Sequence, residues 1–369
     1  MVEYDEWGPE KIVMVYDAKT GMKGFSVIDN TALGPAKGGI RLEPDVTIEE
    51  VARLARAMTW KCALADLPFG GGKSGIIADP KAVNKQEIVA TFSRALKQEI
   101  PEQYIAAPDM NMGEGEMKTF ANANGSLKAC TGKPLDMQGL PHELGSTGFG
   151  VFHSILVALD HRNMDVNDVT VAIEGFGNVG QFTAKYLHEK GAKIVAVSDS
   201  KGGIYNPAGI DVPKLIEVKN NTRAVGNYED AKKIRQSELF ELDVDVLVPG
   251  ARPDVITCKN IGDIKAKIVA EAANIPMTGE MEKVLHNEGI LVIPDFVCNS
   301  GGVISSYVEH IGGDKDKAFK MIEEKITANA KMMLETAKEK CITPRDAGLI
   351  IARDRVKKAM DARYEKMSR

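Results

Sequence analysis

In the first part of the chain, the spacing of hydrophobic and polar residues has the period of a strand in some segments and that of a helix in others. Apolar runs at 12–16 and 24–28 flank a segment that ends in Gly21, a pattern that predicts a β-hairpin. Thr47 and Glu50 have capping-box spacing before a stretch whose apolar residues recur at helical intervals. The N-terminal part therefore combines strands with helices.

Two further elements are expected on either side of residue 100. Asn84 and Glu87 introduce a second amphipathic helix, and the run 104–107 predicts a strand with Asp109 just beyond its end. The glycines of 70–72 predict a turn that leads into a short apolar run.

Strands and helices alternate regularly after Thr147. Helices are expected at 147–162, 178–190, 314–340 and 344–366, and strands at 169–174, 193–198, 244–248, 267–271 and 290–294. Such alternation predicts a parallel sheet covered on both faces. We expect a first domain over 1–147, a second over 148–334, and C-terminal helices of 335–369 that pack back on the first domain.

Composition and charge restrict the class of partner. The chain has 369 residues and a formal net charge of −5, which gives no electrostatic reason to expect nucleic acid or an acidic membrane. No apolar run approaches the ~18 residues of a membrane-spanning helix, and the acidic N-terminus lacks the order of a signal peptide. Five separated cysteines without a CxxC pair and six scattered histidines favour a cytoplasmic protein with reduced thiols and no metal site.

The segment Leu67–Pro80 places Lys73 directly after three glycines. Gly72-Lys73-Ser74 matches the end of a phosphate-binding P-loop, but Leu67 stands where that motif needs its first glycine. The preceding residues also have a helical pattern where the motif needs a strand. The sequence therefore disfavours a P-loop ATPase and instead predicts a lysine in a glycine-walled pocket.

A dinucleotide-binding fingerprint follows the strand expected at 169–174. Its residues are Gly175, Phe176, Gly177, Asn178, Val179 and Gly180. A helix follows the glycines, and the next strand ends in Asp199, where the fingerprint places an acid for the adenine ribose. Asp199 favours NAD, whereas Ser200 and Lys201 could serve the 2′-phosphate of NADP, so the cofactor preference stays open.

Five blocks stand out in order along the chain: Lys37-Gly38-Gly39-Ile40-Arg41, Met58-Thr59-Trp60-Lys61, Leu67 to Pro80, Ala107-Pro108-Asp109-Met110-Asn111-Met112-Gly113 and Asn299-Ser300-Gly301-Gly302-Val303. Together they resemble the glutamate/leucine/phenylalanine/valine dehydrogenase family. The resemblance covers nearly the whole chain. It implies an α/β fold of two domains, an N-terminal mixed-sheet substrate domain and a Rossmann-type dinucleotide-binding domain, with catalysis in the cleft between them.

The resemblance also implies roles for single residues. Lys73 would be the catalytic lysine, Asp109 the group that transfers protons to and from the substrate nitrogen, and Lys61 the partner of the α-carboxylate. Burial and neighbouring ammonium groups favour a neutral lysine, which can activate water and then stabilise an oxyanion. Further implied contacts are those of Gly38 and Asn299 with the substrate, and of Thr147, Ser200, Ala251 and Asn274 with the cofactor.

Substrate choice rests on two polar positions, Lys37 and Ser306. In the glutamate enzymes of the family, equivalent residues hold the γ-carboxylate, whereas leucine-type members carry apolar residues at both. Burying an unpaired ammonium against a leucine side chain would cost several kcal/mol. We therefore expect reversible oxidative deamination of L-glutamate to 2-oxoglutarate with NAD or NADP.

Two alternatives remain, a leucine-, valine- or phenylalanine-type enzyme and a non-catalytic nucleotide-sensing homologue. The short N-terminal segment resembles leucine-type members, and Ile275 and Ser300 replace a usual glycine and alanine. The block 138–147 keeps only its final Thr-Gly. The family forms hexamers for glutamate and larger rings for leucine, so we expect a homo-oligomer, with a hexamer favoured.

Overall fold

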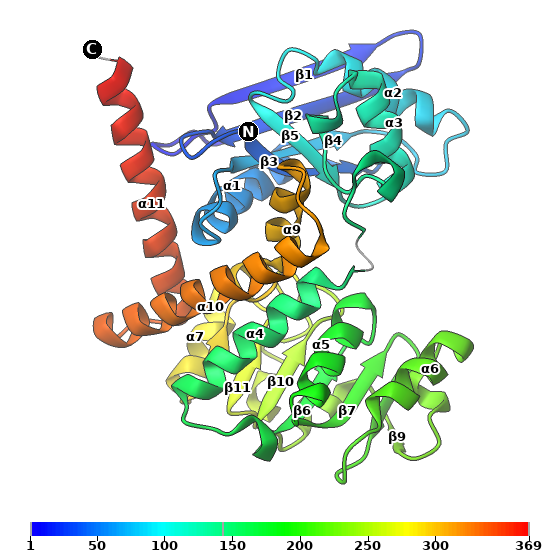
Figure 1. Cartoon of the computed structure of the whole chain (residues 1–369), viewed down its shortest axis with the longest axis vertical. Helices are drawn as coiled ribbons and strands as arrows, with labels where there is room; N and C mark the ends of the chain where they lie inside the picture. The colour runs from blue at the N-terminus through cyan, green and yellow to red at the C-terminus, as the bar shows by residue number, and fades with distance from the viewer. Residues whose placement is uncertain (1, 142–143, 368–369) are drawn as a thin grey trace. The chain divides into compact units, whose positions relative to one another are not determined.

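The computed structural model of the chain describes residues 2–141 and 144–367 and divides into two compact units, which fits the expected α/β fold of two domains (Figure 1). The first unit comprises residues 1–144, 303–318 and 349–369, and the second comprises 145–302 and 319–348. Residues 303–318 thus cluster with the first unit, whereas the expected boundary put them in the second. His142, one of the histidines assigned no metal role, lies outside the described residues.

The first unit is built on a mixed five-stranded sheet in the order β1-β2-β4-β3-β5. The strands are β1 (Lys11–Asp17), β2 (Met22–Asn30), β3 (Ala36–Leu42), β4 (Gly70–Ile76) and β5 (Tyr104–Pro108). The predicted β-hairpin is confirmed, because β1 and β2 pair antiparallel. β2 is antiparallel to β4, and β3 lies parallel between β4 and β5.

The predicted turn at 70–72 is wrong, because these glycines begin β4, the central strand of this sheet. Helix α1 (Ile48–Leu64) packs on this strand, and a Cβ on Gly71 would lie 2.1 Å from the Thr59 hydroxyl oxygen. A Cβ on Gly38 of β3 would lie 1.6 Å from the carbonyl oxygen of Gly72. The glycines therefore permit close approach of backbone to backbone and to helix.

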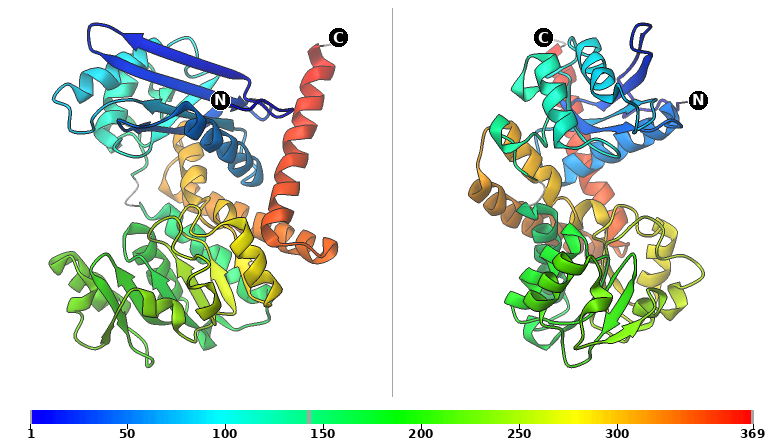
Figure 2. Two further views of the ribbon diagram at one scale, coloured as in Figure 1. Left: turned by 180° about the vertical axis from the view of Figure 1, so that it is seen from behind. Right: turned by 90° about the vertical axis from the view of Figure 1, so that its right-hand side faces the viewer.

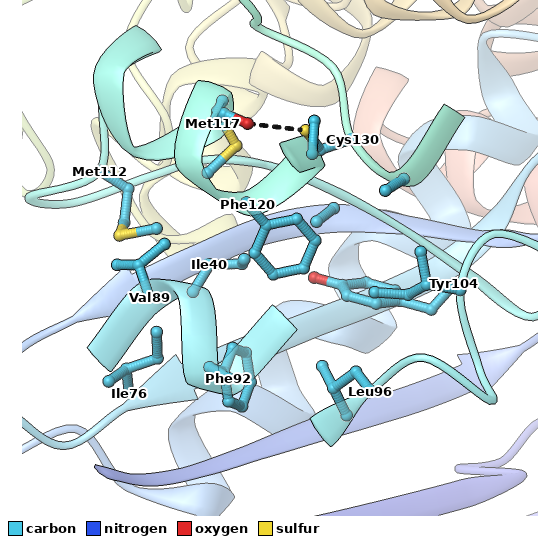
Figure 3. Close-up of a cluster of buried hydrophobic side chains, with 14 of the residues drawn as sticks. Ile40, Ile76, Val89, Phe92, Leu96, Tyr104, Met112, Met117, Phe120 and Cys130 are labelled. Atoms are coloured by element: carbon cyan, nitrogen blue, oxygen red, sulfur yellow. Dashed lines mark hydrogen bonds between the residues drawn. The ribbon is translucent and has the colours of Figure 1, made fainter. Parts of the chain in front are cut away.

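Helices cover both faces of the first sheet. On β2, Val27 packs in the cluster that includes α1, and the adjoining Ile28 packs in the cluster under α2 (Lys85–Ala95) and α3 (Glu114–Asn124). Figure 3 shows this second cluster, which includes Phe92, Tyr104 and Phe120. Alternate residues of one strand thus serve two cores, as the pleat requires.

The two predicted helix starts differ in how they are capped. The Thr47 side chain accepts a hydrogen bond from the Glu50 amide, 3.2 Å away, which confirms the predicted cap of α1. Asn84 precedes α2, but its side chain donates to the carbonyl oxygen of Thr20 (3.3 Å) and makes no capping bond. The Asn84 side chain therefore contacts the β1–β2 hairpin instead of capping its own helix.

The second unit contains a seven-stranded sheet in the order β12-β11-β10-β6-β7-β8-β9 (Figure 2). Its strands are β6 (Thr170–Glu174), β7 (Lys193–Asp199), β8 (Gly202–Tyr205), β9 (Lys232–Ile234), β10 (Val246–Pro249), β11 (Ile268–Ala270) and β12 (Leu291–Ile293). The five strands from β12 to β7 pair parallel, which confirms the predicted parallel sheet. β8 and β9, which were not predicted, add an antiparallel edge.

The second unit also contains helices α4 (Ser146–His161), α5 (Asn178–Glu189), α6 (Val212–Thr222), α7 (Gly279–Asn287), α8 (Asp295–Cys298) and most of α10 (Lys315–Lys340). The other two C-terminal helices, α9 (Gly301–His310) and α11 (Pro344–Met367), belong mostly to the first unit. The predicted helices at 147–162, 178–190, 314–340 and 344–366 are confirmed within a few residues. Among the described residues, none of the helices has the length and apolar character needed to span a bilayer.

Candidate active site

Lys73 and Asp109 form an ion pair in the first unit. Lys73 lies on β4 and Asp109 directly follows β5, and 2.6 Å separate the ammonium nitrogen from the carboxylate. Arg41 of β3 contacts the same carboxylate oxygen at 3.2 Å. Burial alone would raise the pKa of Asp109, but Lys73 and Arg41 outweigh it and hold the pKa below its ordinary value. The carboxylate is thus kept ionised beside the lysine.

Gly39 lies against this pair. A Cβ at this position would lie 2.8 Å from the Asp109 Cβ and 3.3 Å from the Lys73 ammonium nitrogen. A side chain there would displace the catalytic candidates, so glycine keeps the space beside them open. Sequence reasoning gave no role to Gly39 or Arg41, although both lie in the Lys37–Arg41 block.

Lys37 is buried on β3, with 1% of its surface exposed. Its ammonium group donates to the carbonyl oxygen of Ala106 at 3.0 Å. Burial lowers the pKa of Lys37 to about 8, although the carboxylate of Glu309 acts in the opposite direction. An ammonium in this setting is costly unless another anion joins it.

Ser306 and Glu309 lie three residues apart on α9, and hence on neighbouring positions of one helix face. Ser306 is half-buried, and the buried Glu309 carboxylate is 2.5 Å from the Lys133 ammonium. Glu309 also accepts from the amides of Gly132 (3.0 Å) and Leu140 (3.1 Å). These bonds fix α9 against the segment 132–140. Sequence reasoning missed the pair, because nothing local connects residues so far apart in the chain.

The other two predicted substrate contacts of the first unit are Lys61 and Gly38. Lys61 is half-buried in the last turn of α1, the helix that packs on β4. The carbonyl oxygen of Gly38 accepts a hydrogen bond from the Tyr104 hydroxyl at 2.8 Å. Both residues therefore lie on elements that neighbour β4, the strand of Lys73, and a Cβ on Gly38 would lie 3.4 Å from the Lys73 Cα.

The glycine fingerprint forms the turn between β6 and α5 in the second unit. Gly175 has a φ of +94°, and a Cβ there would lie 2.7 Å from the Ala251 amide nitrogen. A Cβ on Gly180 would lie 2.0 Å from the carbonyl oxygen of Gly175, whereas one on Gly177 would meet only open space. The turn is thus tight on its inner side and open at the helix N-terminus, which fits a bound pyrophosphate.

Glu174, the last residue of β6, links this turn to the segment after β10 by hydrogen bonds. Its carboxylate accepts from the amides of Gly250 (3.1 Å) and Ala251 (2.9 Å) beyond β10. Burial raises the pKa of Glu174, against the effect of these two amides. The predicted contact Ala251 therefore lies beside the glycine turn.

Three further predicted cofactor residues flank the same turn in the sequence. Phe176 is buried, Val179 is half-buried, and Asn178 begins α5 with a buried side-chain oxygen that has no described hydrogen-bond partner. Thr147 is half-buried in the first turn of α4.

Asp199 ends β7, and both oxygens of its carboxylate accept hydrogen bonds from the protein. One oxygen accepts from the Lys219 ammonium (2.5 Å) and the Val225 amide (2.8 Å), and the other accepts from the Lys201 amide (2.8 Å). Burial would raise the pKa of Asp199, but Lys219 and the amides lower it. Ser200, the other predicted residue here, is exposed. Lys219 was missed, because it lies on α6, which was not predicted.

Asn274 and Asn299 are brought together after β11. The Asn299 side-chain amide donates to the side-chain oxygen of Asn274 (3.0 Å) and to the carbonyl oxygen of Ala273 (3.2 Å). Asn274 is exposed and Asn299 is buried. Within residues 2–141 and 144–367, no group of three or more His, Cys, Asp or Glu side chains is placed to hold a metal ion.

Family comparisons match both parts of the chain. Residues 139–363 match the model of Glutamate/Leucine/Phenylalanine/Valine dehydrogenase. Residues 9–124 match that of the Glu/Leu/Phe/Val dehydrogenase, dimerisation domain.

Curated relatives agree over most of their length. A glutamate dehydrogenase of Aeropyrum pernix is 44% identical over 362 residues, which cover 92% of this chain and 86% of the relative. An NADP-specific glutamate dehydrogenase of Saccharolobus shibatae is 39% identical, over 96% of this chain and 90% of the relative. An NAD-specific glutamate dehydrogenase of Staphylococcus aureus is 38% identical, over 92% and 86%.

A solved structure is similar over the whole fold. The hetero-hexameric glutamate dehydrogenase of Thermus thermophilus, in its Leu-bound form, superposes with a TM-score of 0.84 and 28% identity, covering 96% of this chain and 90% of that one. The family models, the relatives and this fold agree. The chain therefore belongs to the glutamate/leucine/phenylalanine/valine dehydrogenase family.

Proposed function

We propose that the protein catalyses the reversible oxidative deamination of L-glutamate to 2-oxoglutarate and ammonia, with NAD(P) as the hydride acceptor. The observation that carries this proposal is the Lys73–Asp109 pair, whose charged groups are 2.6 Å apart. Gly39 leaves space beside the pair, and the buried Lys37 lies on the same sheet. Family membership makes the protein an NAD(P)-dependent amino-acid dehydrogenase, and the glutamate dehydrogenases among its relatives support the substrate.

The proposed chemistry assigns one task to each polar group. Asp109, ionised by its neighbours, accepts a proton from the substrate ammonium so that the nitrogen lone pair can form an imine. When bound, NAD(P) would accept the hydride of the substrate α-carbon as the imine forms. Lys73 then directs water to the imine carbon and stabilises the oxygen that becomes the carbonyl of the 2-oxo acid, and Asp109 returns its proton to the nitrogen, which leaves as ammonia. Lys61 binds the α-carboxylate.

The side-chain pocket is the part of the proposal that selects glutamate. Among the described residues, Lys37 has Ala106 as its single hydrogen-bond acceptor, and an ammonium group has three donors. A γ-carboxylate would accept the remaining donors and supply the missing negative charge, with Ser306 as a second donor. A leucine side chain would do neither, and it would leave the buried charge unpaired.

The cofactor preference is proposed to be broad. Asp199 supports NAD, but its carboxylate is already paired with Lys219. Lys219 pairs with Asp199 and Lys201 follows two residues after it, so the end of β7 carries positive charge of the kind that a 2′-phosphate needs. We therefore propose that NAD and NADP are both accepted. The NAD-specific and NADP-specific relatives fit a family in which this preference varies.

One set of assays tests the proposed function. The purified protein is given glutamate, leucine, valine or phenylalanine with NAD or NADP, and the absorbance of the reduced cofactor is followed. Glutamate should give the highest kcat/KM with both cofactors. Faster oxidation of leucine would establish the leucine-type alternative, and binding of NADH without turnover of any amino acid would establish the nucleotide-sensing one.

The assembly and the cellular compartment are proposed on two separate grounds. A hexamer is proposed, because the similar Thermus enzyme is hexameric, and light scattering of the purified protein measures its mass. The cytoplasm is the proposed compartment, because the five cysteines are free thiols and three of them are buried.

A further inference from the structure

Arg345, in the first turn of α11, is surrounded by three acidic side chains of the second unit. Its guanidinium contacts Glu282 of α7 at 2.5 Å, Asp295 of α8 at 2.9 Å and Glu271, directly after β11, at 3.1 Å. We call these four residues the Arg345 cluster. The three acids are almost completely buried, and a single cation holds them together.

The Arg345 cluster continues into the loop that carries Asn274. One oxygen of Asp295 is bound to Arg345, and the other accepts a hydrogen bond from the Ile275 amide at 2.9 Å. Ile275 has a φ of +50°, in the left-handed region that β-branched residues strongly disfavour. The bond to Asp295 therefore holds the backbone in a conformation that it would not adopt alone.

This loop lies at the edge of the sheet where dinucleotides bind. It follows β11, and the glycine turn follows β6, with β10 between these two parallel strands. Neighbouring strands are ~4.8 Å apart, so the loop lies about 10 Å along the carboxyl edge from the glycine turn. When the pyrophosphate lies at the N-terminus of α5, that distance is within reach of the nicotinamide half.

We propose that Arg345 is a positioning residue for the nicotinamide half of the cofactor. It acts through Asp295, which fixes the Ile275 amide and so sets the orientation of the exposed Asn274. Asn299 holds the same loop from the other side, at Asn274 and Ala273. The inference rests on the proposed function for the identity of the ligand. It adds a residue that belongs to neither the glycine turn nor the Lys73–Asp109 pair.

The test compares two ligands that share the adenine half. ADP-ribose needs only the glycine turn and the Asp199 region, whereas NADH also needs the loop after β11. In the Arg345→Lys variant, one ammonium cannot maintain the three contacts of the guanidinium. We expect the affinity for NADH to fall about tenfold and kcat about 10- to 100-fold, with the affinity for ADP-ribose unchanged.

Glu282→Gln is the matched control. It alters a partner of Arg345 within the same cluster but leaves the link from Arg345 through Asp295 to Ile275 in place. We expect it to change the melting temperature and to leave the ratio of NADH to ADP-ribose affinity unaltered. The inference is overturned if Arg345→Lys lowers the affinities for NADH and ADP-ribose equally. It is also overturned if Arg345→Lys and Glu282→Gln change the ratio of these affinities by the same amount, because Arg345 would then have only a structural role.

A second variant covers the case in which Arg345→Lys does not fold. Asp295→Asn keeps the size of the side chain but removes the charge that Arg345 holds, so it should also weaken NADH selectively. An unaltered ratio in folded Asp295→Asn would contradict the inference. Failure of the proposed function is a separate result: the wild-type protein would bind NADH without oxidising glutamate, and the ratio would still decide the role of Arg345.

Discussion

In the proposed mechanism, Lys73 and Asp109, an ion pair from neighbouring parts of one sheet, carry the proton transfer. Replacing Lys73 by alanine removes the ammonium that directs water and stabilises the oxyanion, so kcat should fall by at least ~10²- to 10⁴-fold. Dinucleotide affinity, measured by quenching of intrinsic fluorescence, should be retained. Lys118→Ala is the control, because Lys118 forms an exposed pair with Asp136. Near-normal turnover of Lys73→Ala would refute the assignment.

In the proposed substrate pocket, Lys37 is the residue that selects glutamate over leucine. Lys37→Met keeps an extended side chain without a charge, so the γ-carboxylate of glutamate loses its partner. Transition-state binding of glutamate should weaken by about 2–5 kcal/mol, whereas kcat/KM for leucine should rise. The ratio of the two kcat/KM values measures the change. An unaltered ratio would show that Lys37 does not contact the substrate side chain.

In the proposed cofactor site, Lys219 is the cation that favours binding of a 2′-phosphate. Lys219→Ala frees the Asp199 carboxylate and removes a positive charge, so KM for NADP should rise by more than tenfold while KM for NAD changes little. Steady-state kinetics with each cofactor at saturating glutamate provide the measurement. A parallel rise of both KM values would instead indicate that Lys219 only supports the fold of this region.

At the level of elements, the sequence patterns identified structure wherever a local signal was sufficient. Helix α10 has apolar residues at helical intervals, α11 begins at the start signal Thr343-Pro344, and the β6–α5 turn has fixed glycine spacing. β4 was misassigned because glycines favour turns locally, and only its contact with α1 explains their presence in a strand. Lys133 and Glu309 meet through α9, a contact that no local pattern encodes.

The close contact of β4 with α1 predicts a strong effect of a single methyl group. In Gly71→Ala the new Cβ would lie 2.1 Å from the Thr59 hydroxyl oxygen and 2.5 Å from the Ala55 carbonyl oxygen. Overpacking of this kind costs at least about 1–3 kcal/mol, which denaturant unfolding can measure. Gly115→Ala on α3 is the control: it has open space and should gain about 0.5–1 kcal/mol. Equal stabilities would contradict the argument.

On the scale of the whole molecule, each compact unit is assembled from separate parts of the chain. Residues 303–318 and 349–369 return to the first unit, and 319–348 belong to the second. Such returns depend on contacts between distant segments, so local sequence signals could identify the C-terminal helices but could not assign them to a unit. The Arg345 cluster has the same origin, since its members come from α7, α8, α11 and the end of β11.

The Arg345 cluster makes the stability of the folded protein depend on pH. Burial, together with the carboxylates of Glu282 and Asp295, raises the pKa of Glu271 well above its ordinary value, against the effect of Arg345. The unfolded chain releases this proton above about pH 4.5, while the native state retains it until the higher pKa is reached. The native state therefore binds more protons in that window. Its free energy of unfolding should fall by about 1.4 kcal/mol per pH unit for each retained proton.

Glu271→Gln removes this titration while keeping the size and polarity of the side chain. Its free energy of unfolding, measured by urea titration from about pH 5 to about pH 8, should therefore decline less steeply than that of the wild type. Glu280→Gln, an exposed change on the same α7, should reproduce the wild-type slope. Parallel slopes in all three proteins would show that Glu271 is ionised at neutral pH. In that case Arg345 alone would balance three buried carboxylates. Arg345→Lys should then lower the free energy of unfolding far more than it would if Glu271 kept its proton.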